Sequence, residues 1–271
     1  MARRGSKRQD SSSAGPRARG HKLLDKASAD TTAAQVRAAL AAAADKQRAR
    51  DLQRFFKTGP GDYGEGDVFL GVIVPVQRKV AKRFQYLALR ECETLLHSPV
   101  HEHRLTALLI CCLRFPQGQP EERKAIVDFY LRNTQRINNW DLVDLSAPNL
   151  LGQWLLTQSK QHRSILYERA KSSLLWDRRI AIVATHAFIR AGQCQDTIAI
   201  AEMLLEDKHD LMHKAVGWML REAGKRDMRV LTSFLDKHAT VMPRTMLRYA
   251  IERLSESERK RYMRVKGVSK R

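Results

Sequence analysis

The residues best suited to chemistry lie in the stretch 138–149, where Asp141, Asp144 and an indole occur in a segment with helical character. In a helix, Trp140 and Asp144 are four residues apart and project from one face, so an aromatic plane would flank an acid. Pro148 lacks the N–H that the carbonyl of Asp144 would accept, and it therefore predicts a kink beside the acid. The alternative is structural: an acid caps the helix, the indole is core and the proline marks a boundary.

The elements that must hold this stretch are helices. Apolar residues recur at intervals of three and four, as from Leu105 to Cys112, and residues 30–56 predict one long helix or two joined near Ala44. A short run at 68–74 resembles a strand, but the buried start of a helix explains it equally. Prolines stand where the start of a helix tolerates them, at Pro75, Pro99, Pro120 and Pro243. The predicted fold class is all-α.

A repeat appears among segments that begin at Arg104, Asp141, Arg179 and Lys214, with starts 37, 38 and 35 residues apart. Units of about 40 residues with two helices each are typical of HEAT-like repeats, which stack into an α-solenoid, a superhelix with a concave cleft. The four starts should fall in line along one surface. Because three of them are basic, we predict that this surface is a track for phosphates.

The charge of the chain favours a polyanionic partner. The 271 residues include 49 Lys and Arg against 29 Asp and Glu, a net charge of +20, and 43% hydrophobic residues are enough for a large core. Residues 1–28 carry a net +6 and 259–271 a net +7, so the body between them is still basic. The predicted organisation is a disordered basic arm at 1–28, a repeat domain at 29–258 and a basic tail at 259–271.

Other patterns exclude several classes of protein. No apolar run approaches the roughly 20 residues of a membrane span and no signal peptide is evident, so we expect a soluble intracellular protein without membrane contact. The stretch 59–64 matches GxGxxG, but no strand precedes it and acids surround it, so it predicts a loop rather than a nucleotide site. The four cysteines lack metal or secreted-scaffold spacing and predict buried free thiols: Cys92, Cys111, Cys112 and Cys194.

Two histidine pairs were weighed as metal ligands. His209 and His213 could share a helical face, but no Glu follows the first and no third ligand is evident, so surface histidines are the better interpretation. His101 and His103 precede an apolar segment, and we interpret them as polar residues at a helix start. No metal site is predicted.

Tryptophans occupy comparable places in successive units. Core packing is the better interpretation for Trp154 and Trp176, whereas charged neighbours weaken it for Trp140 and Trp218. Three motifs stand out: Trp140-Asp141-x-x-Asp144 with Leu151-Gly152; Trp176-x-x-Arg179-x-Ala181-Ile182; and Lys214-Ala215-x-Gly217-Trp218-x-Leu220-Arg221-Glu222. Together they resemble the AlkD-type DNA alkylpurine glycosylases, bacterial HEAT-like-repeat enzymes. The resemblance runs from about Phe55 to Leu254 and includes Phe69-Leu70-Gly71-Val72-x-x-Pro75-x-x-Arg78.

The resemblance implies roles for individual residues. It makes Asp144 the catalytic carboxylate, with Trp140 and Trp218 flanking the lesion and Arg179 binding the DNA backbone. Lys214, Arg221 and Arg104 are expected as further DNA-binding residues. The family has a tyrosine on its N-terminal helix near the cleft, where the nearest positions in this sequence are Phe55 and Phe56.

The chemistry agrees with these residues. A purine alkylated at N3 or N7 is cationic and leaves without a proton, so the charge that grows in the transition state lies on the deoxyribose. A carboxylate near the sugar stabilises that charge and orients a water molecule, and indole faces favour a cation. The family leaves the lesion stacked, so no base flipping is expected. Neither a metal nor an organic cofactor is needed.

The sequence therefore supports two hypotheses. The first is a DNA repair glycosylase that hydrolyses the N-glycosidic bond of alkylated purines in double-stranded DNA, acting as a monomer in the bacterial cytoplasm, associated with the nucleoid. The alternative is a HEAT-like scaffold that binds DNA or another acidic partner without cleaving it. Asp144 distinguishes them, because a scaffold has no need of the acid between the indoles.

Overall fold

The computed structural model describes residues 31–264, so the predicted arm at 1–28 lies outside the described residues. Within 31–264 every regular element is a helix, and one isolated parallel bridge joins Val68 to Val100. The predicted all-α class is confirmed, and the strand-like run at 68–74 is an extended approach to a helix that begins at Val74.

The helices of the N-terminal half are α2 (Ala33–Ala41), α3 (Lys46–Phe55), α4 (Val74–Arg83), α5 (Leu89–Leu96), α6 (His101–Arg114) and α7 (Pro120–Arg132). Those of the C-terminal half are α8 (Trp140–Ser146), α9 (Gln153–Leu156), α10 (Ser164–Ala170), α11 (Leu175–Ala184), α12 (His186–Arg190), α13 (Gln195–Met203), α14 (Asp210–Arg226), α15 (Met228–His238), α16 (Arg244–Ala250) and α17 (Glu256–Arg264). Shorter turns are the 3-10 segments η1 (Phe115–Gln117), η2 (Thr134–Arg136) and η4 (Lys160–Arg163) and the π-helical turn η3 (Pro148–Gly152).

Local sequence accounts for several helix boundaries. The segment 30–56 forms two helices because the chain breaks after Ala41 and Asp45 caps α3, its side chain accepting the N–H of Arg48 at 2.9 Å. Pro75 and Pro120 stand in the first turns of α4 and α7, where no N–H is needed. Helix α17 runs from residue 256 to 264, so the boundary predicted at 259 falls inside a helix.

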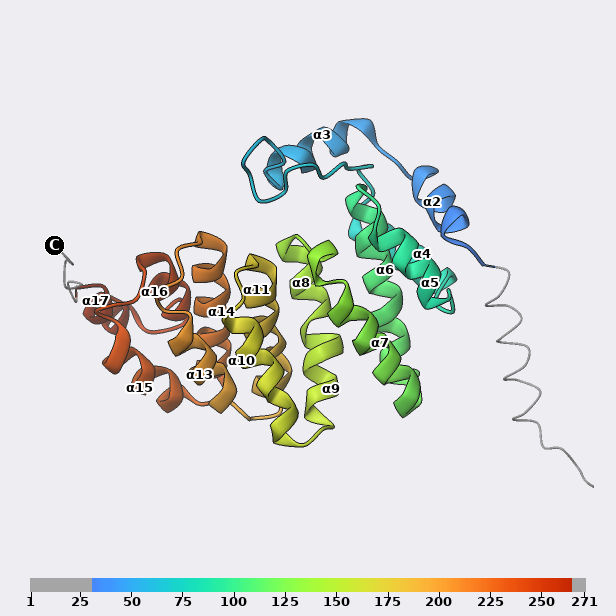
Figure 1. Ribbon diagram of the computed structural model, residues 1–271. Coiled ribbons are helices and arrows are strands. Elements are labelled where there is room, and N and C mark those ends of the chain that lie inside the picture. Colours follow the sequence, from blue (N-terminus) through green and yellow to red (C-terminus); the bar gives the residue numbers. More distant parts are fainter. Residues whose placement is uncertain (1–30, 265–271) are drawn as a thin grey trace, which may run out of the picture.

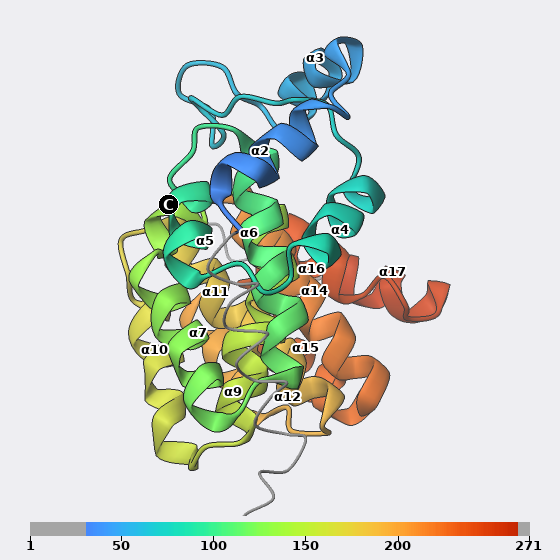
Figure 2. The ribbon, with the colours of Figure 1, turned by 90° about the vertical axis from the view of Figure 1, so that its right-hand side faces the viewer.

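The repeat is visible as a row of stacked helices. Helix α6 packs on α8, α8 on α11, α11 on α14 and α14 on α16, in chain order (Figure 1). Figure 2 views this row from one end, with α7 and α10 on one side and α12, α14 and α16 on the other. The four predicted repeat starts lie in consecutive members of the row, and the HEAT-like superhelix is confirmed.

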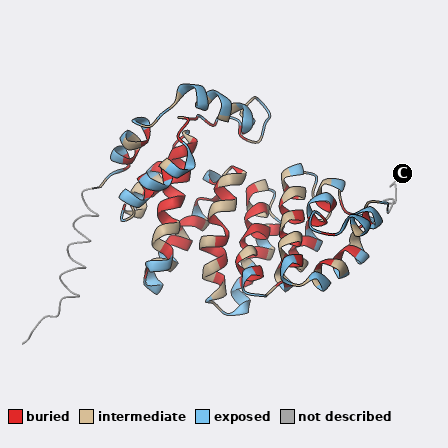
Figure 3. Ribbon diagram, turned by 180° about the vertical axis from the view of Figure 1, so that it is seen from behind, coloured by how far each residue is buried: buried red, intermediate tan, exposed pale blue. Residues whose placement is uncertain are grey.

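The core follows the same row. Every residue of α6 from His101 to Cys111 is buried, and so is every residue of α11 from Arg179 to Ala184. Figure 3 shows this buried band along the middle helices, with exposed residues toward their ends. Neighbours on several sides explain why the apolar pattern of α6 is not confined to one stripe.

Two glycines permit the closest helix contacts. A Cβ at Gly217 would lie 2.4 Å from the carbonyl oxygen of Met246 and 2.6 Å from the Cβ of Tyr249, so α14 and α16 meet backbone to backbone. A Cβ at Gly152 would lie 2.3 Å from the carbonyl oxygen of Ala184. Both glycines belong to the motifs that the sequence singled out, and their role is packing.

The N-terminal segment arches over the row near α6 and α8 (Figure 1). The loop between α3 and α4, residues 56–73 and here called the return loop, is anchored by Glu102 of α6. The buried carboxylate of Glu102 accepts the N–H groups of Leu70, Gly71 and Val72 at 3.0, 2.8 and 3.2 Å. The stretch 59–64 consists of turns and no strand leads into it, so the predicted loop is confirmed. The return loop carries Phe56 and Tyr63 to the N-terminal end of α8.

The remaining sequence expectations concern the cysteines and the membrane. All four cysteines are free thiols; Cys92, Cys111 and Cys194 are buried, and Cys112 is partly exposed. Among the helices between residues 31 and 264, none is both long enough and apolar enough to span a bilayer.

Candidate active site

Asp144 lies on α8, whose start is fixed by a buried cap. Asn139 is fully buried, and its Oδ1 accepts the N–H of Trp140 at 2.8 Å. The α-helical turns give way to the π-helical turn that Pro148 opens, so the backbone geometry changes beside the acid, where the sequence predicts a kink. Trp140 and Asp144, four residues apart, line the same cavity.

The carboxylate of Asp144 is held by Arg179 from the next repeat. The Nε of Arg179 donates to Oδ1 at 2.9 Å and an Nη donates to Oδ2 at 2.8 Å, which is a bidentate pair. The other Nη of Arg179 donates to the carbonyl of Leu211 at 2.6 Å. The DNA-backbone contact expected of Arg179 stays a prediction; in the structure its side chain is 6% exposed and both ends of its fork donate to Asp144.

Two opposing effects act on the acid. Burial raises the pKa of Asp144 above its usual value, while the charge and hydrogen bonds of Arg179 oppose the rise. The side chain of Asp144 is still 20% exposed, so part of the carboxylate faces the cavity. The pair thus gives a carboxylate of fixed orientation beside open space.

The two indoles expected at the site line the same cavity as Asp144. Trp140 stacks on Phe56 at 5.4 Å between ring centroids, and Trp218 lies 5.6 Å from the ring of His186. Both are partly exposed, whereas Trp176 is only 5% exposed, which confirms it as core. Trp154 is partly buried against the core.

The cavity has a volume of about 700 Å³ and combines aromatic rings with cations. Its lining residues are Phe55, Lys57, Tyr63, Trp140, Asp144, Arg179, His209, Asp210, Leu211, Lys214, Trp218, Arg221 and Tyr249. The predicted DNA-binding residues Lys214 and Arg221 are among them. Lys214 pairs with Asp210 at 2.7 Å, and Arg221 contacts Glu222 and Glu252, so both charges are partly neutralised.

Tyr63 was missed by the sequence reasoning. It lies in the glycine-rich loop, lines the cavity and meets Trp176 edge-on at 6.3 Å. Burial raises the pKa of Tyr63, and a hydrogen bond with Trp140 opposes this. Phe55, 63% exposed, lines the cavity as well. The cleft therefore does contain a tyrosine, contributed by the loop; an aromatic residue between glycines beside Phe55 was the available signal.

Arg104 is not brought to the cavity. Its side chain is 5% exposed, pairs with Asp67 at 2.6 Å and donates to the carbonyl of Ser98 at 3.0 Å. The DNA contact at Arg104 and the phosphate track along the repeat starts stay predictions, and the buried pairing of Arg104 gives them no support. The start of α6 turns its arginine toward the return loop instead.

His101 is buried behind the site rather than placed on the surface. One ring nitrogen contacts Asp67 at 3.2 Å and the other contacts Asp141 at 2.8 Å. Burial lowers the pKa of His101, but the charges and hydrogen bonds of Asp141 and Asp67 outweigh it and raise the pKa to about 9. Its ring also stacks on Phe69 at 4.7 Å, so a charged imidazole joins α6, the return loop and α8.

The second histidine pair serves α14. His209 caps the helix by accepting the N–H of Leu211 at 3.2 Å, and His213 contacts the carbonyl of Asp207 at 2.5 Å. His103 is buried against Ser98 at 2.9 Å. Between residues 31 and 264, no three side chains of His, Cys, Asp or Glu are arranged to hold a metal ion.

Fold and site together define a class: a HEAT-like α-solenoid in which an arginine holds an acid in a cavity that two indoles also line. The sequence profile of the family described as DNA alkylation repair enzyme matches residues 36–254, so the chain belongs to this family, and the resemblance found in the sequence is confirmed. The solved structure of a predicted DNA alkylation repair enzyme from Enterococcus faecalis is similar in fold, with a TM-score of 0.61 and 16% identity over 79% of this chain and 97% of that chain. The comparison with curated proteins gave no match.

Proposed function

We propose that this DNA alkylation repair protein is a glycosylase that hydrolyses the N-glycosidic bond of N3- or N7-alkylpurines in duplex DNA. The observation that carries the proposal is the carboxylate of Asp144, fixed by Arg179 and partly open to a cavity that Trp140 and Trp218 also line. Membership in the family supports a role in repair. The arrangement supports the stabilisation of a positive charge.

The proposed mechanism follows from the charge of the lesion. An alkylated purine is already cationic, so the C1′–N bond breaks without prior protonation of the base, and positive charge develops on the deoxyribose. Asp144 stabilises this charge and accepts a hydrogen bond from the water that attacks C1′, and the proton that this water loses passes to solvent. The faces of Trp140 and Trp218 add cation–π attraction, which is stronger where water is excluded. The base leaves as a neutral purine and remains stacked until then.

Arg179 has a positioning role in this proposal. Its two hydrogen bonds fix the orientation of the carboxylate, so little reorganisation is needed as the sugar becomes charged. Its charge also favours the ionised acid against the effect of burial. Lys214 and Arg221, on the same wall, are proposed to contact the phosphates that flank the lesion.

The decisive experiment is the release of methylated bases from alkylated duplex DNA by the full-length chain. EDTA is included because the proposed chemistry needs no metal. Release of N3- or N7-methylpurine is the expected result. If the protein binds the duplex but releases neither base, it is a DNA-binding scaffold and the proposal fails.

A further inference from the structure

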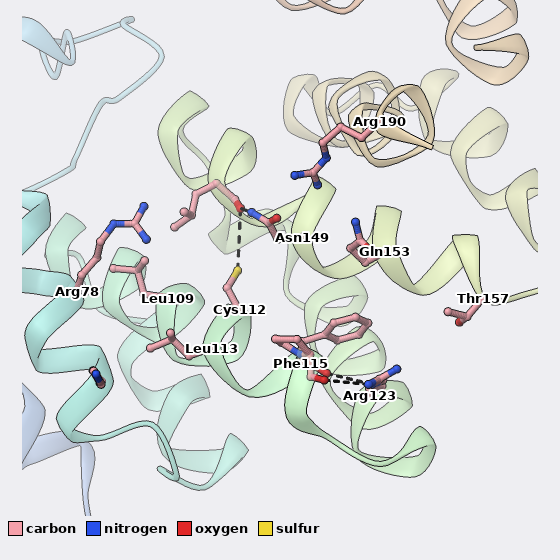
Figure 4. Close-up of a pocket in the computed structure, with 13 residues that line it drawn as sticks. Arg78, Leu109, Cys112, Leu113, Phe115, Arg123, Asn149, Gln153, Thr157 and Arg190 are labelled. Carbon is pink, nitrogen blue, oxygen red and sulfur yellow. Dashed lines mark hydrogen bonds between the residues drawn. The ribbon is translucent and has the colours of Figure 1, made fainter. Parts of the chain in front are cut away.

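A second cavity, here called the basic cavity, lies on another side of α8. It has a volume of about 700 Å³ and is lined by residues of α4, α6, η1, α7, α12 and the segment from Leu145 to Thr157 (Figure 4). Its charged residues are Arg78, Lys82, Arg123 and Arg190. No Asp or Glu lines the basic cavity, whereas acids pair with the cations at the candidate active site.

Three of the four cations have no partner within the described part of the chain. Arg78, Lys82 and Arg190 are exposed, and none makes an ion pair or a side-chain hydrogen bond with residues 31–264. Figure 4 shows the guanidinium groups of Arg78 and Arg190 directed toward the space between them. Arg123 differs, because it donates to the carbonyls of Phe115 and Pro116 at 3.1 and 2.9 Å.

The floor of the basic cavity adds no negative charge. Its uncharged lining combines Leu109, Leu113, Leu145 and Phe115 with amide and hydroxyl side chains. Burial raises the pKa of the Cys112 thiol to about 12, so the thiol is neutral at pH 7. Like charges gathered without a counter-ion repel one another, and a ligand with several negative charges relieves that repulsion. The exposed Arg and Lys side chains can bind phosphates, and the apolar side chains between them can contact the sugars that link those phosphates.

The basic cavity is within reach of DNA bound at Asp144. Asp144 and Leu145 are neighbours on α8 but face directions about 100° apart, and Leu145 lines the basic cavity. Asn149, which also lines it, is five residues after Asp144, or about 8 Å along a helix axis. A duplex carries one phosphate charge per roughly 1.7 Å of its axis, so a duplex bound at Asp144 has several further phosphates within that distance of the lesion. The two cavities therefore flank one helix that a single duplex can cover.

We propose that the basic cavity binds backbone phosphates of the DNA duplex away from the lesion, through Arg78, Lys82 and Arg190. This inference rests on the DNA-repair function proposed above and adds phosphate contacts to those proposed for Lys214 and Arg221. Such contacts carry no base information, so they position the duplex for sequence-independent binding.

The test measures the affinity of the full-length protein for undamaged duplex DNA as a function of salt. The triple variant Arg78→Ala, Lys82→Ala, Arg190→Ala is expected to lose about 0.9 from the log–log salt slope for each cation removed. Between 50 and 200 mM salt, its loss of affinity should be roughly 40-fold smaller than that of the unsubstituted protein. Undamaged DNA is used so that the result stands even if no base is excised.

A matched control removes the same charge elsewhere. Lys79, Arg132 and Lys171 are exposed and lie outside the basic cavity, and their triple alanine variant should keep a slope near that of the unsubstituted protein. Arg78→Lys with Arg190→Lys should also keep it, because charge is retained. Equal slopes for the two alanine triples would overturn the proposal.

A small phosphate is the competing occupant, and inorganic pyrophosphate is the probe for it. Pyrophosphate could bind the unsubstituted protein but not the triple variant of the basic cavity, while the salt slope for DNA is the same in both proteins. In that case the site serves a small phosphorylated molecule and the proposal is wrong. If the slope falls as expected and excess pyrophosphate competes with DNA, the phosphate backbone is the ligand.

Discussion

At the scale of single residues, Asp144 and Arg179 depend on each other. Burying two charges costs solvation free energy that their attraction does not always recover, so such a pair is weak evidence for stability alone. Here the acid keeps part of its surface open to a cavity lined by aromatic rings. A positioned anion explains this arrangement better than a structural ion pair does.

Replacing Asp144 with Asn tests the anion directly. The change keeps the size of the side chain but removes its charge, and single-turnover excision should fall by at least about a hundredfold. The matched control is Asp196→Asn, since Asp196 pairs with the buried Arg163 at 2.7 Å far from the cavity. Both variants should lose melting temperature by leaving a buried arginine unpaired, but only the first should lose excision. Normal excision by folded Asp144→Asn would refute the site.

Replacing Arg179 with Ala should shift the pH dependence of excision. The acid must be ionised to act, and without the charge and two hydrogen bonds of Arg179 its pKa rises further above the usual carboxyl value. The acidic limb of the pH–rate profile should therefore move to higher pH, as measured under single-turnover conditions. An acidic limb that does not move, together with weaker DNA binding and a smaller salt slope, would instead support the phosphate contact first expected of Arg179.

At the scale of elements, His101 joins three parts of the chain. Its imidazole lies between Asp67 of the return loop and Asp141 of α8, and Phe56 links its ring to Trp140. The position of Trp140, one of the two indoles at the candidate active site, therefore depends on a charged group buried behind it.

The pKa of about 9 for His101 predicts a pH-dependent stability. Because the folded value exceeds the ordinary value of about 6.5, the stabilisation is complete below pH 6.5 and is lost as the pH rises through 9. The melting temperature should decline over this interval, and the difference from His101→Gln should shrink. The exposed His162→Gln serves as the control and should follow the unsubstituted protein. A constant difference between pH 6.5 and 9 would contradict the charged imidazole.

Gly217→Ala should destabilise the contact between α14 and α16. The added methyl would meet backbone at 2.4 Å, and such overpacking costs about 1–3 kcal/mol of unfolding free energy. Gly118→Ala is the control, because its nearest neighbour is the flexible side chain of Glu122 at 3.1 Å. Denaturant unfolding should separate the two variants; equal stability would show that α16 moves away without cost.

At the scale of the whole molecule, charge is distributed unevenly. Residues 1–28 hold a net +6, and their removal should weaken DNA binding at low salt and reduce the salt slope. The measurement compares the truncated and full-length chains between 50 and 200 mM salt. A slope that does not change on truncation would show that these residues make no contact with DNA.

The structural features that the sequence predicted are those that depend on the spacing of residues along the chain. A repeat of nearly constant length placed α6, α8, α11 and α14 in one row, and the four-residue interval brought Trp140 and Asp144 together. These outcomes need only helical geometry and stacking.

What the sequence did not predict depends on distant partners. Arg104 begins its repeat as Arg179 does, yet Asp67, 37 residues earlier in the chain, draws it away from the cleft. Tyr63 reaches the cavity through the path of an irregular loop, which no periodicity encodes. Whether Arg179 reaches Asp144 depends on how α8 and α11 are oriented about their own axes, and the spacing of the motifs does not determine that orientation.

The stacking order has a further consequence. In a row where each helix contacts mainly its neighbours, stability is close to a sum of nearest-neighbour terms, and the ends open more readily than the middle. The carboxylate, its arginine and the second indole come from α8, α11 and α14, three adjacent members near the centre of the row. Tyr63 and Tyr249 come from the loop and from α16, nearer the two ends. Local opening at either end of the row would therefore remove Tyr63 or Tyr249 from the cavity, while the pair formed by Asp144 and Arg179 stays assembled.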